Sequence, residues 1–242
     1  MSYIFREHIK QSLAVIAFLI TLTACTSESY DAGDGPNSYL TADLVLLHTS
    51  QDKSVRSALL DDGTTLQFSN PFAQDWLTRP DSVYRALLYY DKTVAASDAV
   101  VSNPTATYIV RARSVRPVSV LRPVEAEDME TLRTDPVGFE SLWLSKNKSY
   151  INLSLLLKSG KTEADDALHA LGIVSHGTTT DADRRRTLHL TLYHDQGGVP
   201  AYYTVQQYVS IPTQLLEEAD TVELTLNTYN GKKVVKVAVS NL

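Results

Sequence analysis

The stretch TVELTLNT, residues 221–228, decides the fold class of the C-terminal part of the chain. Its apolar and polar residues alternate, which is the pattern of a β-strand with one buried and one solvated face. Asn230-Gly231 follows, and this dipeptide predicts a type I′ hairpin turn into a last strand with the same alternation. The residues predicted to face inward are Val222, Leu224, Leu226, Val235, Val237 and Val239.

Four further β-rich runs precede this hairpin, and one of them, RTLHLTLYH, repeats its alternation with leucine at every second position. With the two strands of the hairpin, they make six strands, which predict an antiparallel β-sandwich over residues 137–242. The four runs are SYINLSLLLK (149–158), ALHALGIVS (167–175), RTLHLTLYH (186–194) and AYYTVQQYVSI (201–211).

Shorter β-rich runs fill residues 40–122 and predict a small barrel or sandwich there. Between the second and third runs, Asp61-Asp62-Gly63 is a hairpin turn, because glycine tolerates the positive φ that such a loop needs. Turn chemistry accounts for both aspartates. Residues 123–136, which are acidic and end at Asp135-Pro136, predict a linker. The runs are ADLVLLHT (42–49), VRSALL (55–60), TTLQF (64–68), VYRALLYY (83–90) and ATYIVRAR (106–113).

The start of the chain has the layout of a secretory signal peptide over residues 1–24. Arg6 and Lys10 give a positive start, and the apolar run LAVIAFLITLTAC, residues 13–25, ends at Cys25, the only cysteine. The apolar run is shorter than the roughly 20 residues that span a bilayer. Residues 25–39, which are polar and contain glycine and proline, predict a flexible tether.

The ending Leu-Thr-Ala-Cys resembles a bacterial lipobox, in which the cysteine becomes the first residue of the mature chain and carries the lipid. This resemblance implies that Cys25 is lipidated and attaches the protein to the membrane. We therefore expect a lipid-anchored protein of the cell envelope, at the outer membrane. It either faces the periplasm or is displayed on the cell surface.

Three stretches, together with the lipobox, resemble the NigD-like lipoproteins of Bacteroidetes. They are DDGTTL (61–66), DPVGFESLWLSKNKSYINLSLLL (135–157) and LHLTLYHD (188–195). The resemblance implies an all-β chain with an N-terminal OB-like small barrel followed by a C-terminal antiparallel β-sandwich. The family takes its name from an association with a bacteriocin gene cluster, and the resemblance implies no catalytic residue.

The residues argue against several classes of function. No Gly-x-Ser-x-Gly and no His-Glu-x-x-His occurs, so we expect neither an enzyme nor a cofactor. His189 and His194 are five apart on one predicted strand and point to opposite faces, which argues against a metal site. The formal net charge of −6 argues against nucleic acid as a partner.

Aromatic residues are the candidates for ligand binding, because their flat apolar faces with polar edges suit sugar rings and protein partners. Tyr202, Tyr203 and Tyr208 share one predicted strand, and Trp76 lies in an irregular segment where we expect it to be exposed. Trp143, in FESLWL, is interpreted as a core residue. Tyrosine also suits the surface of a β-sheet, so these residues need no ligand to explain them.

Two short patterns are similar to the Asp-Ser/Thr-apolar acceptors of O-glycosylation in Bacteroidetes. They are Asp81-Ser82-Val83 and Asp220-Thr221-Val222, each at the predicted start of a strand. They make Ser82 and Thr221 candidate glycosylation sites.

Two functional hypotheses stay open. The first is a non-catalytic binding module that recognises a glycan, a peptide or another envelope protein. The second is a structural or accessory lipoprotein without a small ligand, such as a protective partner in a bacteriocin system.

Overall fold

The computed structural model describes residues 40–92, 107–161, 168–216 and 219–239, with no side-chain account of Lys92. Cys25, the predicted signal peptide and the tether lie outside these ranges. In the described part of the chain, no helix is both long and apolar enough to cross a bilayer. The described elements are strands and two single-turn 3₁₀ helices.

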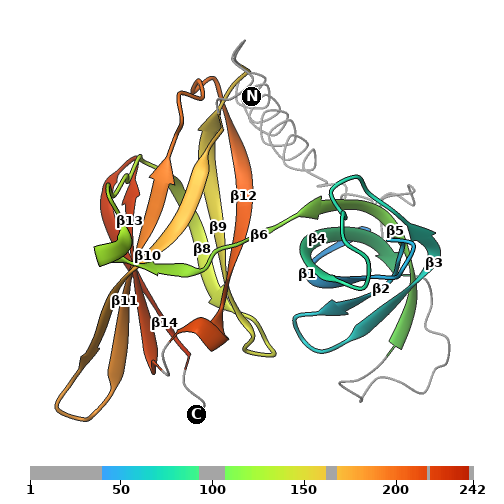
Figure 1. Cartoon of the computed structure of the whole chain (residues 1–242), viewed down its shortest axis with the longest axis horizontal. Helices are drawn as coiled ribbons and strands as arrows, with labels where there is room; N and C mark the ends of the chain where they lie inside the picture. Colours follow the sequence, from blue (N-terminus) through green and yellow to red (C-terminus); the bar gives the residue numbers. More distant parts are fainter. Residues whose placement is uncertain (1–39, 93–106, 162–167, 217–218, 240–242) are drawn as a thin grey trace, which may run out of the picture. The chain divides into compact units, whose positions relative to one another are not determined.

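The first five strands form a closed barrel in the order β1-β2-β3-β5-β4, and pairing between β1 and β4 closes it (Figure 1). Four of the neighbouring pairs are antiparallel, and β3–β5 is parallel. The strands are β1 (Leu40–Thr49), β2 (Val55–Leu60), β3 (Thr65–Phe72), β4 (Val83–Lys92) and β5 (Thr107–Pro117).

The barrel closes around alternate side chains of its strands, as the β pattern requires. Val45 and Leu47 of β1 and Leu88 of β4 are fully buried there. Leu77, from the segment between β3 and β4, is also buried in this cluster, and Trp76 packs against it. Each such side chain contributes about 1.5–3 kcal/mol on burial.

In the described residues, the C-terminal domain has one five-stranded sheet and one four-stranded sheet (Figure 1). The first sheet has the order β14-β13-β11-β10-β7 and the second has the order β6-β12-β9-β8. The strands are β6 (Ser119–Val120), β7 (Pro123–Glu125), β8 (Gly138–Leu144), β9 (Tyr150–Ser159), β10 (Ala170–Thr180), β11 (Arg186–Asp195), β12 (Tyr203–Pro212), β13 (Thr221–Thr228) and β14 (Gly231–Ala238).

The core of the sandwich lies between the two sheets and confirms the alternation read from the sequence. Val222, Leu224 and Leu226 are buried in it, and Val235 and Val237 of β14 pack against the same cluster, as does Val239 just after the strand. Strand β9 is buried on both faces, because Leu153 faces this core while Asn152 and Ser154 are buried on the other side. The candidate site lies on that second face of β9.

The fold class is confirmed: the chain is all-β, with a closed five-stranded barrel and a C-terminal β-sandwich. The pairing within the sandwich is mixed, because β7–β10, β11–β13 and β6–β12 are parallel. The segment predicted as a linker, residues 123–136, contains β7 and the 3₁₀ helix η2 (Ala126–Asp128). The run FESLWL, which was not among the predicted strands, lies in strand β8.

Both predicted hairpin turns occur, but their glycines sit one position later than a type I′ turn places them. Thr228 pairs with Gly231, so Tyr229 and Asn230 occupy the turn. Gly231 has a φ of +102° and Gly63 a φ of +88°, whereas the residues before them have negative φ. Each is a type I turn followed by a left-handed glycine, so the type I′ prediction for Asn230-Gly231 was wrong, whereas the positive φ expected of Gly63 is confirmed.

Candidate functional site

A cleft of about 620 Å³ is lined by both the barrel and the sandwich. The barrel contributes β1, β4 and the β2–β3 hairpin, through Leu44, Leu87 and Asp62 among others. The sandwich contributes the second face of the β6-β12-β9-β8 sheet, including Glu140 and Tyr208. The cleft therefore combines an apolar wall with a polar one.

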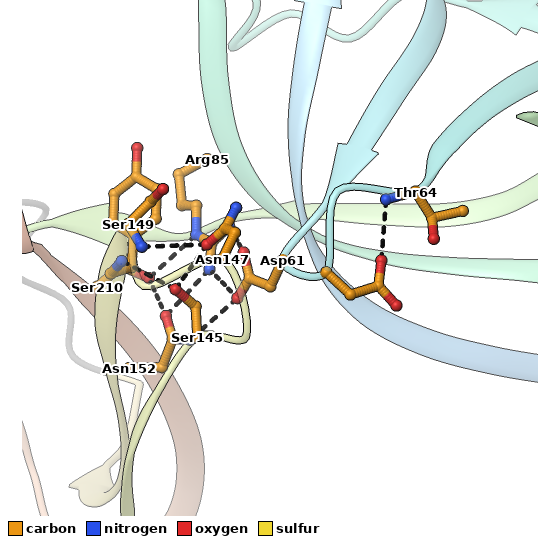
Figure 2. A network of polar contacts seen from close by, with 10 residues as sticks. Asp61, Thr64, Arg85, Ser145, Asn147, Ser149, Asn152 and Ser210 are labelled. Atoms are coloured by element: carbon orange, nitrogen blue, oxygen red, sulfur yellow. Dashed lines mark hydrogen bonds and ion pairs between the residues drawn. The ribbon is translucent and has the colours of Figure 1, made fainter. Parts of the chain in front are cut away.

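A buried polar network next to the cleft links the barrel to the sandwich (Figure 2). Arg85 of β4 donates from Nη1 and Nη2 to the two carboxylate oxygens of Asp61, over 2.6 and 2.7 Å. It also donates from Nη2 to Oδ1 of Asn152 at 3.0 Å, and from Nε to Oγ of Ser210 at 3.1 Å. The Arg85 side chain is only 1% exposed, so all of these contacts lie in a region of weak solvent screening.

The partners of Arg85 also bind one another. Ser210 donates to Oδ1 of Asn152 at 2.8 Å, and Asn152 donates from Nδ2 to Oδ2 of Asp61 at 3.0 Å. The guanidinium carbon of Arg85 lies 4.4 Å from the ring centre of Tyr150. A network whose members are satisfied by one another holds its strands in one arrangement, whereas a half-satisfied one destabilises the fold.

The sequence interpretation of Asp61 as a turn residue was incomplete. Asp62 stabilises the turn, because its Oδ1 accepts a hydrogen bond from the backbone N–H of Thr64 at 2.9 Å. The Asp61 side chain instead binds Arg85, and its backbone carbonyl accepts the N–H of Asn147 in the sandwich at 2.7 Å. The β2–β3 hairpin is therefore an attachment point for the second domain.

Leu44, Leu87 and Val118 form a small apolar cluster, and its two leucines line the barrel side of the cleft. Trp143 and Tyr208 of the sandwich pack against this cluster, with their ring centres 6.4 Å apart and their planes at 84°. Edge-to-face packing of this kind is favourable for aromatic pairs. Trp143 was expected in a core, but it is half-buried and lines the cleft.

Glu140 is the carboxylate of the sandwich wall. Its Oε2 accepts hydrogen bonds from Oγ of Ser154 at 2.6 Å and from Nε2 of Gln206 at 2.5 Å. These two bonds lower the pKa of Glu140 below its usual value. Burial alone would raise the pKa of Asp62, but hydrogen bonds from Thr64 and the charge of Lys146 lower it overall. Both carboxylates are ionised at neutral pH.

The structure brings one of the predicted aromatic residues, Tyr208, into the cleft. Tyr202 and Tyr203 are 79% and 50% exposed at the start of β12 and do not line it. Trp76 was expected to be exposed, but it is half-buried and packs edge-on against Tyr84, with ring centres 5.8 Å apart. The segment between β3 and β4 folds onto the barrel core, because neighbouring Leu77 is anchored inside it.

The candidate glycosylation sites lie at the starts of strands, as expected. Ser82 directly precedes β4, is half-buried and donates to the carbonyl of Pro80 at 2.8 Å. Thr221 opens β13 and is half-buried, with a paired strand on either side. Their modification stays a prediction, and the intact mass of the native protein tests it.

A row of polar side chains on the sheet face was not anticipated from the sequence. Thr179 lies 2.8 Å from Nε2 of His189, and Nδ1 of His189 lies 3.1 Å from Glu223. This order resembles the hydroxyl–imidazole–carboxylate series of acyl-transfer enzymes. However, Lys236 also binds the carboxylate, at 2.9 Å, and Thr179 does not line the hollow above His189 and Glu223. We interpret the row as surface hydrogen bonding.

The described residues contain no group of three or more His, Cys, Asp or Glu arranged to hold a metal ion. His194 is buried and pairs with His169, whose Nδ1 lies 3.0 Å from Nε2 of His194. His189, as expected, lies on the other face of the same strand.

The sequence did carry a signal for the missed residues. Arg85 interrupts the apolar run VYRALLYY, and Asn152 and Ser154 interrupt YINLSLLL. A polar residue inside an apolar strand needs a partner when it is buried. No sequence pattern says which partner, because Arg85 and Ser210 are separated by 125 positions.

Comparison with known proteins places this architecture in a family. Residues 120–239 match the model of the NigD-like C-terminal beta sandwich domain. No curated protein matches the chain. Several solved structures are similar to it in fold at low sequence identity, and three of them are described next.

A NigD-like immunity protein from Bacteroides caccae has a TM-score of 0.59 and 23% identity, over 81% of this chain and 91% of that one. A candidate lipoprotein from Bacteroides fragilis has a TM-score of 0.58 and 13% identity, over 84% and 98%. A candidate toxin-related protein from Parabacteroides distasonis has a TM-score of 0.53 and 20% identity, over 82% and 92%. Through its matching β-sandwich domain, the chain belongs to the NigD-like family.

Proposed function

We propose that the protein is a lipid-anchored protein of the cell envelope that binds a ligand without transforming it, in the cleft between barrel and sandwich. The observation that carries this proposal is the cleft itself, in which the aromatic side chains of Trp143 and Tyr208 lie on the same sheet as the hydrogen-bonded carboxylate of Glu140. Its volume of about 620 Å³ falls in the range of small-molecule sites. Cys25 is the proposed point of lipid attachment, at the outer membrane.

The electrostatics of the cleft support binding over catalysis. A general acid or base works best when its pKa lies near the operating pH. Hydrogen bonds lower the pKa of Glu140, and Thr64 and Lys146 lower that of Asp62. Asp61 is held by two hydrogen bonds from Arg85. These carboxylates act as fixed acceptors.

The Arg85 network supports a preformed site. Binding costs less when the site is already ordered, because fewer side chains lose freedom on association. The network joins β4 and the β2–β3 hairpin to β9 and β12, the same elements that line the cleft.

The experiment is a ligand screen with soluble residues 26–242 on glycan and peptide arrays, with hits measured by calorimetry. Binding in the cleft is expected to be lost in Tyr208→Ser. It is expected to persist in Tyr202→Ser, a matched tyrosine outside the cleft. A ligand that is lost with Tyr202 and kept with Tyr208 would place the binding site elsewhere and contradict the proposal.

The second candidate function is protection through a protein partner. Two of the similar structures are a NigD-like immunity protein and a candidate toxin-related protein. The surface that favours it is the edge of β12: β9 pairs with all ten residues of this strand, whereas on the other side, within the described part of the chain, β6 pairs only with Val209 and Ser210. Residues 203–208 of this edge, YTVQQY, contain no charge, although charged residues commonly guard open edges.

A pull-down from the native outer membrane tests this second function. A partner that adds a strand to β12 is expected to be lost with Thr204→Lys, which places a charge on the edge. It is expected to persist with Tyr208→Ser. The reverse result would assign the partner to the cleft.

A further inference from the structure

We infer that the ligand of the cleft is a neutral saccharide, held by Glu140 and Gln206 and packed against Trp143 and Tyr208. This inference rests on the proposed binding function and names its ligand class. All four residues line the cleft, and they come from β8 and β12 of the same sheet.

Glu140 is oriented to accept hydrogen bonds from a ligand. Both of its bonds to the protein use Oε2, from Ser154 and Gln206, and its Oε1 accepts none from the described residues. Both donors are neutral, so the carboxylate is positioned without a cation that would cancel its charge. An ionised carboxylate accepts stronger hydrogen bonds than a neutral oxygen does, and the hydroxyl groups of a sugar are suitable donors.

The aromatic pair supplies the second feature that a sugar requires. A pyranose presents C–H groups on its faces, and these pack on aromatic side chains while its hydroxyls bind polar groups at the edge. Trp143 and Tyr208 are half-buried in the cleft, and Leu44 and Leu87 extend the apolar wall. An aromatic wall beside a fixed acceptor matches this two-sided chemistry.

The charges of the cleft exclude other ligand classes. Asp43, Asp61, Asp62 and Glu140 line it together with one lysine, Lys146, and of these acids Asp61 is paired with Arg85, so phosphates, sulfates and acidic sugars are repelled. A purely apolar chain would strip water from these carboxylates without replacing its hydrogen bonds. A cation gains little here, because Glu140 is exposed and solvent screens an ion pair at such a site.

The test uses residues 26–242 and three probes: neutral glycans such as mannan and xylan oligosaccharides, polygalacturonate, and oligolysine. Binding is expected for a neutral glycan, with little dependence on salt, and not for polygalacturonate. Glu140→Gln is expected to weaken it about tenfold, because a charged acceptor becomes neutral. Glu127→Gln, which makes the same change on an exposed glutamate outside the cleft, is the control.

A second variant separates binding from folding. Tyr208→Leu keeps apolar volume but removes the aromatic face, and it is expected to abolish glycan binding with the fold retained by circular dichroism. Glycan binding that survives both Glu140→Gln and Tyr208→Leu would overturn the inference. Salt-sensitive binding of oligolysine that depends on Glu140 would refute the saccharide but leave the binding function intact. If no probe and no array ligand bound, both the saccharide inference and the proposed binding function would be refuted.

Discussion

Replacing Arg85 by methionine tests whether the buried network holds barrel and sandwich together. The substitution keeps much of the side-chain length. It removes the hydrogen bonds that Arg85 donates to Asp61, Asn152 and Ser210. Removing one partner of a buried ion pair typically costs about 3–5 kcal/mol, because the other charge is left uncompensated. The Asp61 side chain is 20% exposed and regains some water, so we expect a loss of about 3 kcal/mol.

The assay is urea unfolding of residues 26–242 at pH 7, and Arg113→Met is the matched control. Arg113 of β5 pairs with Asp91 of β4; the Asp91 side chain is 17% exposed, close to the 20% of Asp61, but the arginine is 39% exposed against 1% for Arg85, so the two pairs differ in the burial of the cation. Ion pairs at this exposure contribute at most about 1 kcal/mol. In the double variant Arg85→Met/Asp61→Asn, part of the loss is expected to return, because no unpaired charge remains.

A loss from Arg85→Met of about 1 kcal/mol or less, as expected for an exposed pair, would refute the reasoning. It would mean that water largely replaces the guanidinium, and that the network does not hold the two domains. A further loss in the double variant would contradict the claim that the uncompensated charge of Asp61 dominates.

Three further predictions concern a glycine, a histidine and the anchor. Gly197→Ala is expected to destabilise far more than Gly198→Ala in urea unfolding: both have positive φ, but a Cβ at Gly197 would lie 2.2 Å from the carbonyl oxygen of Leu168, whereas at Gly198 it meets nothing within 4 Å. Burial and neighbouring His194 lower the pKa of His169 below its usual 6.5, so the contribution of His169 to the free energy of unfolding is fully present above pH 6.5 and is lost as the pH falls below that value. His169→Gln should therefore make the free energy of unfolding depend less on pH below 6.5. Cys25→Ala is expected to release the protein from the membrane fraction, and unchanged fractionation would contradict lipidation.

Local physics explains why the architecture could be predicted from the sequence. Alternation such as that of Val222, Leu224 and Leu226 depends only on which face of a strand is buried. It is the same whichever strand pairs with it. The pairing itself is not local. The parallel pairing of β11 with β13, for instance, places Leu188 opposite Val222, although β12 lies between these strands in the sequence. The alternation of residues in a strand does not show whether its partner runs parallel or antiparallel.

Asp61 shows why the site was harder to predict than the fold. A complete local explanation was available, since aspartate before Asp-Gly is ordinary in a turn. The structure divides the two acids: Asp62 caps the turn, and Asp61 binds Arg85, 24 positions later, and Asn152, 91 positions later. A residue with a sufficient local role gives no sign of a second, distant one. The unexplained residue was its partner, because an arginine in the middle of an apolar strand has no local role and must find a carboxylate elsewhere.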